Sequence, residues 1–277
     1  MAWKPVWTTV RRTTLAVLVA TAALGAAAPA AAKTLCTLVV EAGSGRTVLE
    51  EGDCTGRVTP ASTFKVPLAV MGFDAGILKG PHVPVLAYRK GDVAWRPEWT
   101  QPTDPTRWLK YSVVWYSQRI THALGADRFH RYAVAFDYGN ADLSGDPGRN
   151  NGLDRSWIGS SLTVSPREQV TFLRRLVTGG LPVSPQAMAL TRAIVETRDG
   201  GEGWTVHGKT GAAFPRLADG NFDRARGWGW YVGWAKKDGE TYVFARLIQD
   251  EVRNSVPAGF RSRDGFIAGW QAMAARF

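Results

Sequence analysis

Two apolar runs near the C-terminal end constrain the fold of this chain most strongly. They read GWGWYVGWA at 227–235 and TYVFARLIQ at 241–249, and the segment between them contains Asp238-Gly239. An Asp-Gly pair between apolar or alternating runs is a strong signal for a tight β-hairpin. We therefore expect an antiparallel strand pair here, preceded by a further strand in TVHGKTG at 205–211.

A second hairpin is expected near the start of the chain, where two short apolar runs surround the turn 42–45. Between the two hairpins, helix signals dominate. Asp104-Pro105 and Ser184-Pro185 combine a capping residue with a first-position proline, and Ser165-Pro166-Arg167-Glu168 is a capping box. Other expected helices cover 60–78, 113–124, 127–136 and 264–276.

These elements predict a mixed α/β fold. Strands from both ends of the chain would share one antiparallel sheet, and a helical region at about 66–200 would be inserted between them.

The first 32 residues have the pattern of an export signal. Lys4, Arg11 and Arg12 precede the apolar stretch 15–28, and Ala30-Ala31-Ala32 offers a cleavage site. We expect cleavage after Ala32, a periplasmic domain at 33–277, and no membrane contact once the signal is removed. The arginine pair leaves both Sec and twin-arginine export open.

Cys36 and Cys54 are the two cysteines of the chain, and they lie equally far from position 45. They could therefore face each other across the N-terminal hairpin. Because export places them in an oxidising compartment, we expect a disulfide between them. The alternative is two free thiols.

The net charge of the chain is +10, and three positive charges belong to the export segment, which leaves +7 for the mature domain. The basic residues are scattered among acids and aromatics, and no RNA- or DNA-binding signature is present, which argues against nucleic acid. The basic balance agrees at least as well with anionic small substrates. The four histidines form no HExxH pattern, so no metal site is expected.

The heptapeptide ASTFKVP at 61–67 places Ser62 three residues before Lys65. In a helix this spacing makes the two side chains neighbours. A serine becomes a nucleophile when a base removes its proton, and a lysine can be that base only when it is neutral. The apolar neighbours Phe64 and Val66 predict a buried Lys65 with a lowered pKa.

A second signal is Lys209-Thr210-Gly211, on a predicted strand far downstream. Lys209 can attract a carboxylate, the Thr210 hydroxyl can bind it, and Gly211 would let the substrate backbone lie against the strand edge. The alternative is a trio of turn residues at the end of a strand.

The combination of S-x-x-K with a downstream K-T-G resembles the penicillin-recognising serine enzymes. Where other branches have S-x-N, this chain has SVV at 112–114, followed by YGN at 138–140 and a segment around Trp157. These motifs, in this order, resemble the class D, oxacillinase-type (OXA) serine β-lactamases over essentially the whole mature chain. The resemblance implies hydrolysis of small β-lactams, antibiotic resistance, and a monomer or homodimer.

The resemblance also implies the roles of individual residues. Ser62 would form the acyl-enzyme, and Lys65, N-carboxylated from carbon dioxide or bicarbonate, would be the general base. Ser112 would pass a proton to the leaving nitrogen, and Trp157 would hydrogen-bond the carbamate. No other cofactor is implied. The remaining site residues would be Lys209, Thr210, Gly211, the backbone N–H of Ala212, Val114, Tyr138 and Asn140.

Another observation favours a modified lysine. Class A relatives deacylate with a glutamate in an E-x-x-x-N pattern, and this chain contains none. Turnover would then need another base, and Lys65 is the available group.

An arginine that binds the substrate carboxylate is expected after the last two strands. Arg253, Arg261 and Arg263 are the candidates, and the context Ala258-Gly259-Phe260-Arg261 favours Arg261. The connection 214–226 is long, and we expect it to lie where antibiotic side chains project.

Two other functions remain open. A penicillin-binding sensor or D,D-peptidase would acylate without efficient turnover, but a sensor should carry several membrane spans. An inactive cell-wall binding module should have lost one of the motifs, and all of them are intact.

Overall fold

The computed structural model describes residues 1–5 and 32–277, so most of the expected export segment lies outside the described residues. Within this part, six strands form one antiparallel sheet in the order β2-β1-β6-β5-β4-β3. The strands are β1 (Ala32–Glu41), β2 (Thr47–Gly52), β3 (Thr197–Gly201), β4 (Trp204–Ala213), β5 (Trp228–Lys237) and β6 (Glu240–Asp250).

The first and last strands of the chain, β1 and β6, pair with each other within this sheet. Strand β1 pairs with β6 from Ala32 opposite Asp250 to Glu41 opposite Tyr242. The C-terminal hairpin turns at Asp238 and Gly239, whose φ angles of 50° and 89° are both left-handed. Such a two-residue turn matches the twist of the flanking strands, and glycine adopts it without a Cβ penalty. The shared sheet and the hairpin are therefore confirmed.

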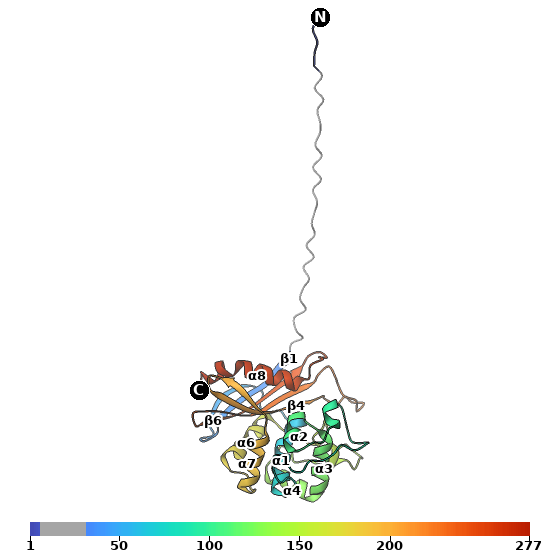
Figure 1. The fold of residues 1–277 in the computed structure, drawn as a ribbon, viewed down its shortest axis with the longest axis vertical. Helices are drawn as coiled ribbons and strands as arrows, with labels where there is room; N and C mark the ends of the chain where they lie inside the picture. Colours follow the sequence, from blue (N-terminus) through green and yellow to red (C-terminus); the bar gives the residue numbers. More distant parts are fainter. Residues whose placement is uncertain (6–31) are drawn as a thin grey trace.

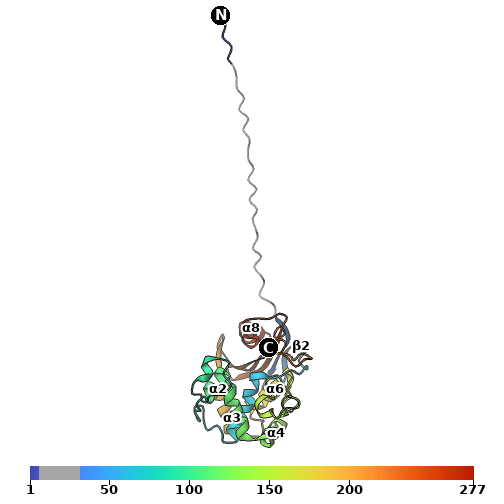
Figure 2. The ribbon, with the colours of Figure 1, turned by 90° about the vertical axis from the view of Figure 1, so that its right-hand side faces the viewer.

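Helices cover both faces of the sheet (Figure 1). Helix α8 (Ala258–Ala274) packs on one face, and the inserted helical region, with α6 nearest to β1 and β6, covers the other, as Figure 2 shows from the side. The inserted region comprises α1 (Lys65–Asp74), α2 (Pro105–Tyr111), α3 (Val114–Leu124), α4 (Ala126–Ala135), α5 (Gly152–Arg155), α6 (Pro166–Thr178) and α7 (Pro185–Ile194).

Local side-chain chemistry explains where several helices begin. The side chains of Asp104, Ser165 and Ser184 each accept a backbone N–H at the start of α2, α6 and α7, and a proline follows each cap. Each cap satisfies backbone N–H groups that would otherwise be unpaired, and it needs only a few consecutive residues to do so. Such caps can therefore be recognised from sequence alone. All three predicted helix starts are confirmed.

Two predicted helices differ in extent. The stretch 60–78 divides into a 3₁₀ turn, η1 (Ala61–Phe64), and helix α1, and Ala61 has a φ of 51°. Pro67 lies in the first turn of α1, where its missing N–H breaks no helical bond. Helix α8 begins at Ala258 rather than at 264, so Arg261 lies within this helix.

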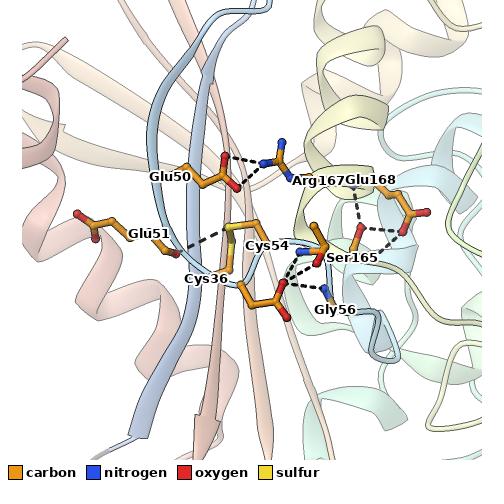
Figure 3. The surroundings of a disulfide bond; sticks show 10 residues. Cys36, Glu50, Glu51, Cys54, Gly56, Ser165, Arg167 and Glu168 are labelled. Atoms are coloured by element: carbon orange, nitrogen blue, oxygen red, sulfur yellow. Dashed lines mark hydrogen bonds and ion pairs between the residues drawn. A yellow bond between two sulfur atoms is a disulfide. The ribbon is translucent and has the colours of Figure 1, made fainter.

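The disulfide between Cys36 and Cys54 is confirmed, with an S–S distance of 2.02 Å (Figure 3). Cys36 lies in β1 and pairs in register with Gly52, so Cys54 follows the end of β2 rather than belonging to it. Close by, Arg167 of helix α6 donates to Glu50 of β2 at 2.5 and 2.8 Å. Together these links tie the chain that leads to η1 against the sheet.

None of the helices formed by residues 1–5 and 32–277 has both the length and the apolar character needed to cross a membrane.

Candidate active site

The S-x-x-K motif places its two side chains at the junction of η1 and α1. Ser62 lies in the 3₁₀ turn, Lys65 is the first residue of the helix, and Lys65 Nζ donates to Ser62 Oγ at 3.4 Å. The side chain of Lys65 is buried, with 1% of its surface exposed. A lysine amine therefore stands directly beside a serine hydroxyl, out of contact with bulk water.

This burial changes the protonation of Lys65. Desolvation lowers the pKa of the Lys65 amine well below its ordinary value, and the positive charge of Lys209 lowers it further. Both effects favour the neutral amine, the form that a lysine base requires.

Buried polar contacts hold the nucleophile turn. Thr63 Oγ1 donates to the carbonyl of Pro60 at 2.7 Å, and Gln169 Nε2 donates to Thr63 Oγ1 at 2.7 Å. The Tyr138 hydroxyl then donates to Gln169 Oε1 at 3.1 Å. Because all of these side chains are buried, each bond orients the next, and the chain of contacts links helix α6 to the turn that carries Ser62.

Strand β4 brings the second lysine to the site. Lys209 Nζ donates to Ser112 Oγ at 2.5 Å and to the carbonyl of Thr210 at 3.0 Å. Ser112 follows α2 in a left-handed conformation, with φ of 58° and ψ of 38°. Helix α2 thus ends where its last turn can present the Ser112 hydroxyl to Lys209.

Burial also lowers the pKa of Lys209, to about 7. The negative charge of Glu196 opposes this shift, whereas the positive charges of Arg96 and Arg263 add to it. Lys209 therefore changes from the charged to the neutral form within the physiological pH range.

Gly211 lies where three elements approach one another. A Cβ atom on Gly211 would come within 2.8 Å of the Pro60 carbonyl oxygen, and one on Gly259 of α8 would come within 2.5 Å of the Gly211 oxygen. The glycine therefore permits η1 to pack on β4. Room for substrate backbone against this strand is a separate role of Gly211, which stays a prediction.

A cavity of about 130 Å³ opens beside Ser62. From the predicted residues it brings together Ser62, Ser112, Val114, Thr210, Gly211 and Ala212. Its other walls were not predicted: they are Trp95, Arg96, Trp99, Lys110, Tyr111, Pro257, Gly259 and Phe260. The sequence WRPEW at 95–99, with two tryptophans and an arginine in five residues, is the one signal that could have indicated this wall.

Comparison with known proteins identifies the family. The model of the penicillin binding protein transpeptidase domain matches residues 27–261. Beta-lactamase OXA-9 of Klebsiella pneumoniae is 43% identical over 84% of this chain and 85% of its own length. This chain belongs to the class D β-lactamase family.

Other class D proteins agree. Beta-lactamase OXA-1 of Escherichia coli is 33% identical over 84% of this chain and 82% of its own. The crystal structure of OXA-427, a class D β-lactamase, superposes with a TM-score of 0.81 at 44% identity, covering 87% of this chain and 98% of that one. The predicted fold class and family resemblance are thus confirmed.

The class D motif YGN does not line the cavity. Tyr138 is buried behind the site, its ring 5.5 Å from that of Phe64. Asn140 donates to the carbonyl of Ser161 at 2.9 Å and accepts from the Thr163 backbone at 3.0 Å. Tyr138 thus hydrogen-bonds the residue that supports the nucleophile turn, and Asn140 holds the loop around Ser161 and Thr163.

The class D tryptophan packs against Phe64, the residue before Lys65. The Trp157 ring stacks on Phe64 with centroids 5.7 Å apart and an interplanar angle of 25°. Its carbonyl accepts from Thr59 Oγ1 at 3.0 Å, which ties the loop to the segment before η1. Because Phe64 lies between Ser62 and Lys65, Trp157 packs against the short segment that carries both catalytic candidates.

The predicted carboxylate-binding arginine is engaged elsewhere. Arg261 forms an ion pair with Asp250, and its Nε donates to the carbonyl of Val256 at 3.1 Å. Helix α8 begins early enough to turn this side chain toward the end of β6, and Arg261 does not line the cavity. Arg253 and Arg263 do not line it either.

The long connection 214–226 likewise does not contribute to the cavity wall. Arg216 donates to the carbonyl of Gly159 at 2.8 Å and to Asp146 at 2.6 Å. The connection is therefore fastened to the loop that leads to Trp157.

The described part of the chain contains no cluster of three or more His, Cys, Asp or Glu side chains arranged to hold a metal ion.

Proposed function

We propose that this protein hydrolyses β-lactam antibiotics through a Ser62 acyl-enzyme, with N-carboxylated Lys65 as general base in acylation and deacylation, and so confers β-lactam resistance. The observation that carries the proposal is the 3.4 Å contact between Lys65 Nζ and Ser62 Oγ in a site that lowers the pKa of the lysine. Relatives named β-lactamases, at 43% and 33% identity, support this substrate class.

The environment of Lys65 fits the proposed modification. A neutral amine can attack carbon dioxide, forming a C–N bond and releasing one proton, and burial favours the neutral form of the Lys65 amine. Bound there, a carbamate would supply an anionic oxygen base. Lys65 would carry it, Trp157 would be its hydrogen-bond donor, and Val114 would exclude water from it.

The residues of the chain divide the first half-reaction between them. Ser62 Oγ would attack the lactam carbonyl while the general base on Lys65 takes the hydroxyl proton, and the carbon–nitrogen bond of the ring breaks. The leaving nitrogen takes up a proton through Ser112 Oγ, to which Lys209 Nζ donates. Backbone N–H groups of Ser62 and Ala212 would bind the developing oxyanion, an interaction worth about 3–4 kcal/mol per donor in other enzymes.

Recognition and deacylation complete the cycle. Lys209 and Thr210 would bind the substrate carboxylate on the cavity side of β4. Water would then attack the carbonyl of the Ser62 ester as the general base takes one proton from the water. The ester C–O bond breaks, and the proton taken from the water passes to Ser62 Oγ. The product is the ring-opened amino acid with one new carboxylate.

The test is hydrolysis of a chromogenic cephalosporin by the purified protein, with and without added bicarbonate. We expect turnover that bicarbonate increases and that Lys65→Ala abolishes. Bicarbonate-independent turnover that survives Lys65→Ala would contradict the role of the lysine. Acylation without turnover would favour a penicillin-binding sensor or D,D-peptidase, and no reaction at all would favour an inactive binding module.

We also propose that the protein is exported to the periplasm by the N-terminal segment 1–32, cleaved after Ala32. The disulfide between Cys36 and Cys54 supports an oxidising compartment. N-terminal sequencing of the periplasmic protein should begin at Lys33, and size-exclusion chromatography would distinguish the monomer from the homodimer.

A further inference from the structure

A cation in the wall of the cavity beside Ser62 would stabilise the carboxylate of an anionic substrate. The arginines on or before α8 are poorly placed to provide this cation. Arg261 is paired with Asp250, which is itself buried. Arg263 donates to Asp264 at 2.7 Å, and Arg253 is exposed away from the cavity lining.

Arg96, in contrast, lines this cavity. It belongs to the segment that contributes Trp95 and Trp99, and its guanidinium carbon lies 5.3 Å from the ring centroid of Phe260. Within residues 1–5 and 32–277, no acidic side chain forms an ion pair with it. Arg96 is therefore a cation in the wall of the cavity whose charge is not neutralised by a neighbouring carboxylate.

The charge of Arg96 also acts on Lys209, which donates a hydrogen bond to Ser112 in the cavity wall. It lowers the pKa of Lys209, and does so more strongly than Arg263. Two cations that affect each other in this way create a positive potential between them, which an incoming carboxylate would neutralise.

We propose that Arg96, rather than Arg261, supplies the guanidinium that binds the substrate carboxylate, together with Lys209 and Thr210 of β4. This assignment rests on the proposed function and names the residue that selects anionic β-lactams. The Phe260 ring supports the planar guanidinium, which reduces its freedom before the substrate arrives.

The two cations would have different roles as the pH changes. Lys209 loses its charge around pH 7, whereas a guanidinium stays protonated throughout the range in which the enzyme works. Arg96 would thus maintain selection for a carboxylate above neutral pH, where Lys209 contributes less.

The test compares benzylpenicillin with its methyl ester, which lacks only the negative charge. For the wild type we expect kcat/KM to favour the acid strongly. Arg96→Met should reduce this acid-to-ester preference about tenfold or more, the usual loss for a hydrogen bond to a charged group. The effect should appear in KM, because the reacting centre is untouched, and Arg96→Lys should restore part of the preference.

Arg263→Met is the matched control, since Arg263 also contacts the Phe260 ring, at 5.0 Å, without lining the cavity. It should retain the wild-type preference. An unchanged preference in Arg96→Met, or an equal loss in Arg263→Met, would overturn the assignment while leaving β-lactam hydrolysis intact. Failure of the wild type to hydrolyse benzylpenicillin would instead refute the proposed function and, with it, this assignment.

Discussion

The positive charge of Lys209 lowers the pKa of the Lys65 amine, so the two buried lysines of the site are electrostatically linked. One is adapted to lose its proton beside Ser62, and the other is held against Ser112. Strand β4 and helix α1 therefore each contribute one lysine to the same electrostatic site.

The first prediction concerns pH and Lys209. Because its pKa is lowered to about 7, Lys209 is charged below that pH and increasingly neutral above it. We expect KM for an anionic β-lactam to rise as the pH increases from 6 to 9, which steady-state kinetics would measure. In Lys209→Arg the charge persists, so the rise should be smaller. A KM that is constant over this range in the wild type would contradict the prediction.

The second prediction concerns the stability cost of Lys65. Its folded-state pKa is lowered, so below the unfolded value near 10.4 the unfolded chain binds more protons, and burial of this amine opposes folding. Lys65→Met should abolish turnover yet stabilise the protein by ~1 kcal/mol at pH 7 in bicarbonate-free buffer. The gain should shrink as the pH rises toward 10. Chemical denaturation measures it.

Lys79→Met is the control for this change, because Lys79 is exposed and the substitution should alter the free energy of unfolding by less than ~0.5 kcal/mol. If the two substitutions changed the free energy of unfolding equally, burial of the Lys65 amine would not destabilise the folded protein.

The third prediction concerns the contact between Thr63 and Gln169. Thr63→Val leaves the Gln169 amide without its 2.7 Å partner in a buried site, which should cost about 1–3 kcal/mol of stability. We also expect kcat to fall, because the turn that carries Ser62 loses its support. In a double-mutant cycle with Gln169→Leu, the combined loss should be smaller than the sum of the single losses. Strict additivity would show that the two residues act independently.

The fourth prediction concerns the packing of α8 on β4. Gly259→Ala would place a methyl group 2.5 Å from the Gly211 oxygen, so we expect a lower Tm and a lower kcat/KM. Gly265→Ala is the matched control on the same helix, since its nearest neighbour would lie 3.7 Å away. That change should stabilise the protein by ~0.5–1 kcal/mol through helix propensity alone. Destabilisation of both variants to the same extent would argue against a specific contact.

The fifth prediction concerns the disulfide. It closes a loop with a sequence separation of 18, for which chain entropy predicts ~3 kcal/mol of stabilisation. The double variant Cys36→Ala, Cys54→Ala should lower the free energy of unfolding by this amount, measured by denaturant titration. Reducing agent should destabilise the wild type and leave the variant unchanged.

Much of the architecture could be predicted because its signals are local. The caps at Asp104, Ser165 and Ser184 satisfy nearby N–H groups, and Asp238-Gly239 adopts the left-handed turn of a hairpin. The neighbouring positions of Ser62 and Lys65 follow from their spacing within one turn. Such features depend on a few consecutive residues and on backbone geometry.

The walls of the cavity depended on contacts between distant segments. Arg96 and Phe260 are far apart in sequence, and only the tertiary structure brings the guanidinium carbon within 5.3 Å of the ring centroid. The pairing of Arg261 with Asp250, and the buried position of Tyr138, likewise follow from how helices pack rather than from any motif.

By itself, then, the sequence determined the order of the elements, the nucleophile and its lysine, and the cysteines that pair. The tertiary structure decided which side chains face the substrate and how far burial lowers the pKa values of Lys65 and Lys209. The physical reason is that capping and turn preferences act over a few residues, whereas desolvation and charge interactions depend on everything that packs around a group.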